Sequence, residues 1–131
     1  GQLKGKIDSL GKRVLGDRYR RLVVPYKEIA SYYRSANVFT LASQTEAFGI
    51  SYLEAMACNL PVVTTADGSR EEIIGEAGIL TDPQNIEKYA KDLKIAATTN
   101  YKNKPYAQSL KFSWNKIAAN YSDLIGDLLK K

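Results

Sequence analysis

The stretch that decides the fold is residues 38–65, VFTLASQTEAFGISYLEAMACNLPVVTT. Two short apolar runs, 38–41 and 61–65, flank a segment of apolar and small residues at 50–58. Asn59 suits the left-handed position after a helix, and the proline beyond it cannot continue the helix. Continuous apolar runs are typical of parallel strands covered on both faces. The stretch therefore predicts strand, helix and strand, the unit of parallel α/β sheets.

The same alternation extends in both directions and predicts one α/β domain, a Rossmann-like parallel sheet flanked by helices. We expect about residues 1–84 to form its α/β part and about residues 85–131 to form a helical tail. In the tail, Ile86, Tyr89 and Leu93 share one face of a helix. Further helices are expected at 3–15, 27–35, 50–58, 70–74, 86–97 and after 113, and further strands at 19–24 and 78–81.

Composition excludes several classes of function. The 131 residues include no histidine and one cysteine. Zinc–histidine sites, histidine-based triads and an intrachain disulfide framework are therefore excluded, and a reducing compartment such as the cytoplasm is expected. No apolar run approaches the length of a membrane span, and the first residues lack the apolar core of a signal peptide.

The net charge of +5 has one source. Residues 1–21 carry seven basic and two acidic residues, whereas residues 22–131 carry twelve of each. The basic segment is a solvated helix face, a phosphate or membrane contact, or a surface that a neighbouring part covers. An alternative function follows, a non-enzymatic module that binds nucleic acid or an anionic membrane surface through residues 1–21. Salt-dependent binding would distinguish it.

The candidate site lies in residues 43–61, which follow a strand and open a helix. Open α/β sheets bind ligands at this position, beyond the carboxyl ends of their strands. The amides of Gly49, Ile50 and Ser51 are then unpaired donors at a helix start, which suits an anion. Glu46 precedes the helix, and Glu54 lies about one turn into it.

These two carboxylates repel a phosphate but accept hydrogen bonds from hydroxyl groups. A ligand with a central diphosphate and a polyol at each end fits the arrangement, which describes a nucleotide sugar. Taken alone, the spacing of Glu46 and Glu54 is ordinary. Helix-dipole contact and a solvated face explain the two residues equally well. A glycoside hydrolase is not favoured, because nothing indicates an acid of raised pKa facing a second carboxylate.

Residues 46–63 closely resemble the Glu-x7-Glu segment of retaining glycosyltransferases of the group 1 family, which have the GT-B fold. Flanking stretches also resemble that family, in the right order. They are residues 24–28, 32–38 and 41–43 before the segment, and 75–83 and 112–114 after it.

The resemblance implies specific roles. Glu46 would contact the transferred sugar as the catalytic residue, and Glu54 would accept hydrogen bonds from the ribose hydroxyls. Backbone amides at 48–50 would bind the donor sugar and diphosphate, with Ser51 beside the phosphates. The base would lie near residues 24–26. By name, the sugar and diphosphate group is Phe48, Gly49, Ile50 and Ser51, and the base group is Val24, Pro25 and Tyr26.

The implied reaction moves a hexose from a nucleotide diphosphate sugar to an acceptor hydroxyl with retention of configuration. It needs no metal and no cofactor. The acceptor, a saccharide or lipid of polysaccharide biosynthesis, would bind an N-terminal domain, and the enzyme would associate peripherally with the inner face of the membrane. No nucleic acid is implied as a partner.

The chain also departs from the family pattern. The Gly-Arg pair and the lysine that grip the diphosphate have no match, so we expect a donor-binding domain truncated at its N-terminal side and inactive by itself. Asn59 stands in place of the family's usual glycine. Residues 69–72 stand where a small residue, Leu, Pro and Glu are common, so only Glu72 matches and Arg70 is unexplained.

Overall fold

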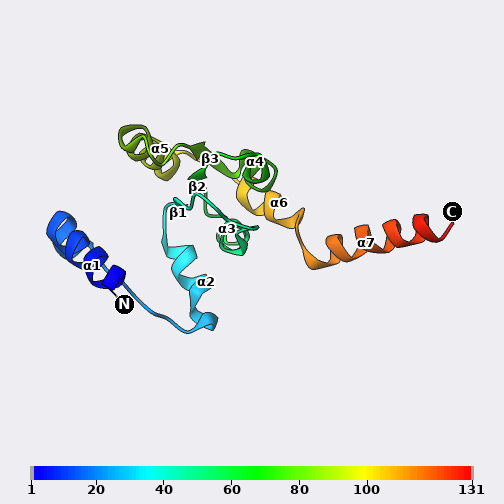
Figure 1. The fold of residues 1–131 in the computed structure, drawn as a ribbon, viewed down its shortest axis with the longest axis horizontal. Helices are drawn as coiled ribbons and strands as arrows, with labels where there is room; N and C mark the ends of the chain where they lie inside the picture. Colours follow the sequence, from blue (N-terminus) through cyan, green and yellow to red (C-terminus); the bar gives the residue numbers. More distant parts are fainter. Residues whose placement is uncertain (1, 131) are drawn as a thin grey trace.

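The computed structural model describes residues 2–130, and its centre is a three-stranded parallel sheet (Figure 1). The strand order is β1 (Phe39–Leu41), β2 (Val62–Thr65) and β3 (Gly78–Thr81). Phe39 pairs with Val62, and Val62 pairs with Gly78. The predicted fold class, a parallel α/β sheet flanked by helices, is confirmed.

The connections between strands are helical, as right-handed parallel crossovers require. Helix α3 (Ile50–Ala57) joins β1 to β2, and α4 (Gly68–Ile74) with the short η2 (Gly75–Ala77) joins β2 to β3. Helix α2 (Tyr26–Ser35) precedes β1 and packs against α3. Helix α5 (Ile86–Thr98) follows β3 and packs against β2 and β3.

The hydrophobic core lies between α3, α4 and the sheet. The backbone of β2 passes close to Gly78, where an added Cβ would lie 1.8 Å from the carbonyl oxygen of Val62. Only glycine therefore fits this point of the β2–β3 pairing. The buried residues of the core are Tyr52, Ala55, Met56, Leu60, Val62, Ile73, Ile74 and Ala77.

The strand expected at 19–24 does not form. Residues 19–25 are extended but pair with no strand among residues 2–130, and Val23 is 90% exposed. A β-prone sequence becomes a strand only when a neighbour supplies hydrogen bonds, which none does here. β1 is likewise less enclosed than expected: it lies at one end of the strand order, and Thr40 is exposed.

Helix α6 (Lys104–Leu110) lies between the helices expected at 86–97 and after 113 and is not among those that the sequence predicts. α6 packs against α3, and Asn59 fixes this arrangement. Asn59 has φ of 59°. Its side-chain Nδ2 donates to the Lys102 carbonyl at 2.7 Å, and its side-chain Oδ1 accepts from the backbone amide of Tyr106 at 3.3 Å. Asparagine thus provides both the left-handed turn and two bonds that glycine lacks.

The terminal helices α1 (Gln2–Leu15) and α7 (Trp114–Leu129) project from opposite ends of the central sheet (Figure 1). Between α1 and the extended segment lies the one-turn η1 (Gly16–Arg18). Both terminal helices expose their apolar faces, and Trp114 is 85% exposed. No helix in the described part of the chain is long and apolar enough to cross a membrane.

Candidate functional site

One edge of the sheet gathers the segments that the sequence singled out. All three strands are parallel, so their carboxyl ends, at Leu41, Thr65 and Thr81, share this edge. The loops that follow the three strands at this edge lead into α3, α4 and α5. The predicted sugar and diphosphate residues lie at the start of α3, beside the loop that leads from β2 into α4.

Gly49 makes the entry into α3. It has φ of 76° and ψ of 60°, a left-handed conformation that most side chains avoid. An added Cβ would also lie 2.2 Å from Cε2 of Tyr52. The Tyr52 ring is buried, and its hydroxyl is 3.0 Å from the Thr64 hydroxyl of β2. The ring cannot move aside, so glycine is required by conformation and by space.

The start of α3 presents backbone amides without a side-chain cap. Gly49 is the N-cap residue, and no side chain in the described part of the chain accepts a hydrogen bond from the first turn. The first amides of any helix lack intrahelical partners. Ile50 is exposed, and the Phe48 ring before it contacts Phe112 edge-to-face at 6.0 Å. The predicted anion-binding amides are thus at an open helix start whose preceding residue is held by packing.

Glu46 lies in the exposed loop between β1 and α3. Within residues 2–130, no hydrogen bond or ion pair engages its carboxylate. The loop is shaped instead by Ser43, whose hydroxyl donates to the carbonyl of Thr45 at 2.7 Å. The Glu46 carboxylate is therefore exposed and free to accept hydrogen bonds; its predicted contact with a sugar stays a prediction.

Glu54 is the best-defined carboxylate of the site. Its Oε1 accepts a hydrogen bond from the Tyr26 hydroxyl at 3.2 Å, and its Oε2 accepts one from the Tyr33 hydroxyl at 3.1 Å. The structure thereby brings together two residues that the sequence assigned separately, Tyr26 to the base and Glu54 to the ribose. Val24, half-buried, and Pro25, the N-cap residue of α2, immediately precede Tyr26.

Tyr33 is a site residue that sequence reasoning missed. Its ring packs edge-to-face against Phe39 at 5.7 Å. Burial, and then the nearby negative charge of Glu54, raise the pKa of Tyr33 to about 12. The hydroxyl therefore stays protonated and remains a donor. Its spacing from Tyr26, seven residues or two turns of α2, is the signal that could have indicated a shared partner.

Arg70, unexplained by the sequence, is buried at the start of α4 with 1% of its surface exposed. Its Nη1 donates to Oδ2 of Asp67 at 2.6 Å, while Nε and Nη2 have no partner among the described residues. Asp67 also caps α4 by accepting from the Arg70 amide at 2.9 Å. This amide, the Ser69 hydroxyl and the guanidinium charge hold the pKa of Asp67 below its ordinary value.

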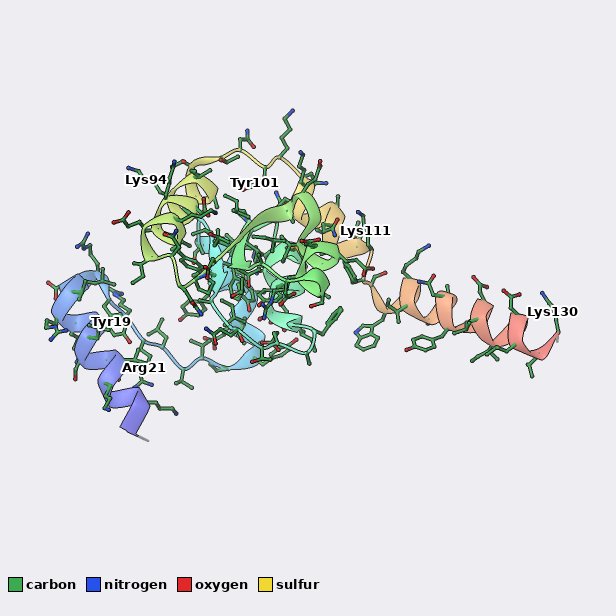
Figure 2. All side chains as sticks on the ribbon, turned by 45° about the horizontal axis from the view of Figure 1, so that its top comes forward. Tyr19, Arg21, Lys94, Tyr101, Lys111 and Lys130 are labelled. Carbon is green, nitrogen blue, oxygen red and sulfur yellow. The ribbon has the colours of Figure 1, made fainter. Side chains whose placement is uncertain are left out.

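The basic opening segment lies apart from this edge. Asp8 of α1 accepts hydrogen bonds from the Tyr19 hydroxyl at 2.9 Å and from Nε of Arg21 at 2.7 Å, and Figure 2 shows both residues alongside α1. These bonds, Arg21 first, lower the pKa of Asp8. They fold the segment after η1 back onto α1 rather than toward α3.

Comparisons with known proteins agree on one family. The family model described as "Glycosyl transferases group 1" matches residues 22–109. A probable sucrose-phosphate synthase of Thermosipho melanesiensis is 33% identical over 79% of this chain and 26% of its own length. The O-antigen chain mannosyltransferase B of Escherichia coli is 32% identical over 70% and 25%. A D-inositol 3-phosphate glycosyltransferase of Streptomyces bingchenggensis is 29% identical over 79% and 24%. The chain thus spans about a quarter of these relatives.

Proposed function

The chain belongs to the group 1 glycosyl transferases, and from this premise we propose that it binds the nucleotide-sugar donor of a retaining hexosyl transfer. The observation that carries the proposal is Glu54, whose two carboxylate oxygens each accept one hydroxyl hydrogen bond on the helix that also presents the uncapped amides. A carboxylate that accepts two hydroxyl groups beside an anion-binding helix start suits a ribose joined to a diphosphate.

Each part of the donor has an assigned contact. The backbone amides at the entry to α3, of Phe48, Gly49 and Ile50, bind the donor sugar and the diphosphate, with Ser51 beside the phosphates, and stabilise the negative charge that develops as the glycosidic bond breaks. Glu46 binds hydroxyl groups of the transferred sugar and orients it. The base lies near Val24, Pro25 and Tyr26.

The transfer itself rests on positioning and charge stabilisation by these groups, without a metal or a cofactor. The acceptor, a saccharide or lipid, binds elsewhere in the full-length protein, which works in the cytoplasm at the inner face of the membrane. The names of the relatives, which include a synthase of a sugar phosphate and a mannosyltransferase, support a sugar as the group transferred.

The test is binding of UDP, GDP and ADP to the full-length protein by calorimetry. Glu54→Ala should weaken binding of the preferred nucleotide about 10- to 100-fold, because it removes hydrogen bonds to a charged acceptor. Glu76→Ala is the matched control, since Glu76 is an exposed glutamate just before β3, at the opposite edge of the sheet. Unchanged affinity of Glu54→Ala for all three nucleotides would contradict the proposal.

A second variant separates binding from transfer. Glu46→Gln should lower kcat for sugar transfer and leave nucleoside diphosphate affinity unchanged, because these nucleotides lack the sugar that Glu46 contacts. Loss of nucleotide affinity in Glu46→Gln would show that the residue acts elsewhere on the donor.

A further inference from the structure

The two tyrosines on Glu54 form an unusual arrangement of donors. Tyr26 and Tyr33 lie two turns apart on α2, and each places one hydroxyl on a different oxygen of the same carboxylate, at 3.2 Å and 3.1 Å. Two neighbouring hydroxyl groups on one carboxylate are also what the 2′- and 3′-hydroxyls of a ribose would supply. The protein therefore already makes with its own side chains the hydrogen-bond pattern that the proposed function assigns to the ligand.

The two tyrosines differ in how firmly they are held. Tyr33 is half-buried, its ring contacts Phe39, and Phe39 in turn contacts the buried Tyr52 at 6.1 Å. Tyr26 is 78% exposed, and its ring makes no aromatic contact within residues 2–130. A water molecule can replace the Tyr26 hydroxyl at little cost, whereas displacing Tyr33 would disturb packing against the core.

We propose that the Tyr26 hydroxyl is an internal substitute for one ribose hydroxyl and leaves Glu54 when a ribonucleotide binds, while Tyr33 stays and orients the carboxylate. A carboxylate oxygen has two acceptor positions, so Oε2 can keep Tyr33 and still accept one ribose hydroxyl. The other ribose hydroxyl takes the place of Tyr26 on Oε1. Tyr26 is then a specificity-determining residue that sets a threshold for ligands with a ribose diol.

The role of Tyr26 rests on the proposed role of Glu54, and it predicts by how much the Tyr26 contact reduces the affinity for a ribonucleotide. A ligand that must displace an internal contact binds with an affinity reduced by the fraction of molecules in which the contact is open. An exposed hydrogen bond of ordinary net strength is closed for most of the time, so the reduction is about two- to tenfold.

The experiment compares Tyr26→Phe with the unaltered full-length protein, using UDP, GDP and ADP as probes. The variant keeps the ring and removes the competing hydroxyl, so the preferred ribonucleotide should bind about two- to tenfold more tightly. Tyr32→Phe is the matched control, since Tyr32 is an exposed tyrosine of α2 without a hydrogen bond from its hydroxyl to another described residue. Its affinity should not change.

Deoxynucleotides make the test specific. The gain in Tyr26→Phe should disappear for whichever analogue, 2′-deoxy or 3′-deoxy, lacks the hydroxyl that replaces Tyr26. Tyr33→Phe should weaken the ribonucleotide but leave the 2′,3′-dideoxy analogue unchanged, because Tyr33 acts through Glu54. A purely structural role of Tyr33 would weaken both ligands alike.

The outcomes separate two failures. If Glu54→Ala weakens binding but Tyr26→Phe does not strengthen it, or strengthens all analogues equally, Tyr26 is no substitute for a ribose hydroxyl and the inference is overturned. If Glu54→Ala has no effect, the ribose role itself fails, and the proposed function fails with it.

Discussion

Replacement of Arg70 by methionine should stabilise the protein. Arg70 is buried, and among residues 2–130 its guanidinium is paired through Nη1 alone, with an Asp67 side chain that is 38% exposed. Methionine fills a similar length of space without a charge to desolvate. The cap of α4 survives the change, because Asp67 accepts from the backbone amide of residue 70 and from the Ser69 hydroxyl.

The magnitude follows from the balance between desolvation and pairing. Replacing a buried ion pair by an apolar side chain of similar volume is neutral or stabilising by about 1–4 kcal/mol. Because the carboxylate of this pair is partly solvated, we expect Arg70→Met to raise the free energy of unfolding by about 1–2 kcal/mol. Removing the charge of the other partner, Asp67, is costly. Asp67→Asn retains a good capping side chain but leaves the buried charge of Arg70 without a counter-charge. It should lower the free energy of unfolding by about 2–4 kcal/mol.

Urea unfolding followed by circular dichroism measures both variants and their double variant. In the Arg70→Met background, Asp67→Asn should cost less than about 0.5 kcal/mol, because its penalty acts only through the guanidinium. The reasoning would be refuted if Arg70→Met lowered the free energy of unfolding by more than about 1 kcal/mol. That result would mean that Nε and Nη2 have partners whose loss outweighs the desolvation of the charge.

Three shorter predictions test residues that hold the helices and turns of the domain in place. Gly49→Ala should lower the free energy of unfolding by about 2 kcal/mol or more and abolish nucleotide binding, because the Cβ meets the Tyr52 ring at 2.2 Å; urea unfolding and calorimetry check this. Asn59→Ala should cost about 2–3 kcal/mol and Asn59→Gly about 1 kcal/mol, since glycine recovers the turn but not the two side-chain bonds; equal losses would contradict this. The pKa of Asp92 is lowered from 3.8, first by the hydrogen bond from Lys88. The ionised Asp92 therefore contributes its full stabilisation above pH 3.8, and this stabilisation is lost as the pH falls through the depressed pKa. The free energy of unfolding of Asp92→Asn should consequently fall less in acid than that of the unaltered protein.

The central strand–helix–strand unit could be predicted because its signals are local. Asn59 adopts the left-handed conformation that its position after α3 demands, and β2 is buried over most of its length as its apolar run indicates. Such features depend on the preferences of a few consecutive residues. The unpaired amides at the start of α3 could be predicted for the same reason, since the first turn of a helix exposes its backbone amides wherever the helix lies in the fold.

Features that depend on a distant partner could not be predicted. The apolar spacing placed Ile86 on the inner face of α5, but it is 78% exposed. Asp92 is buried there instead, with Lys88 at 2.5 Å, and Lys88 also donates to Thr81 of β3 at 3.0 Å. Hydrophobic spacing cannot indicate that a carboxylate is buried, here beside a lysine one turn away whose ammonium also reaches Thr81 on β3. Arg70 differs, because its partner Asp67 is only three residues away; what the sequence could not indicate is that tertiary packing buries the guanidinium.

The spacing within the Glu-x7-Glu segment has a geometric reason. Ile50 and Glu54 are four residues apart on α3, so they share one face and are separated by about 6 Å along the axis. One rigid helix therefore sets the distance between the uncapped amides at its start and the carboxylate, and the left-handed Gly49 sets where that helix begins. The tyrosines that engage Glu54 belong to α2, however, and packing of α2 on α3 decides their contact. The site thus combines a part that sequence specifies locally with a part that tertiary packing supplies, and substitutions in the second part should change the selectivity for a ribose that we propose.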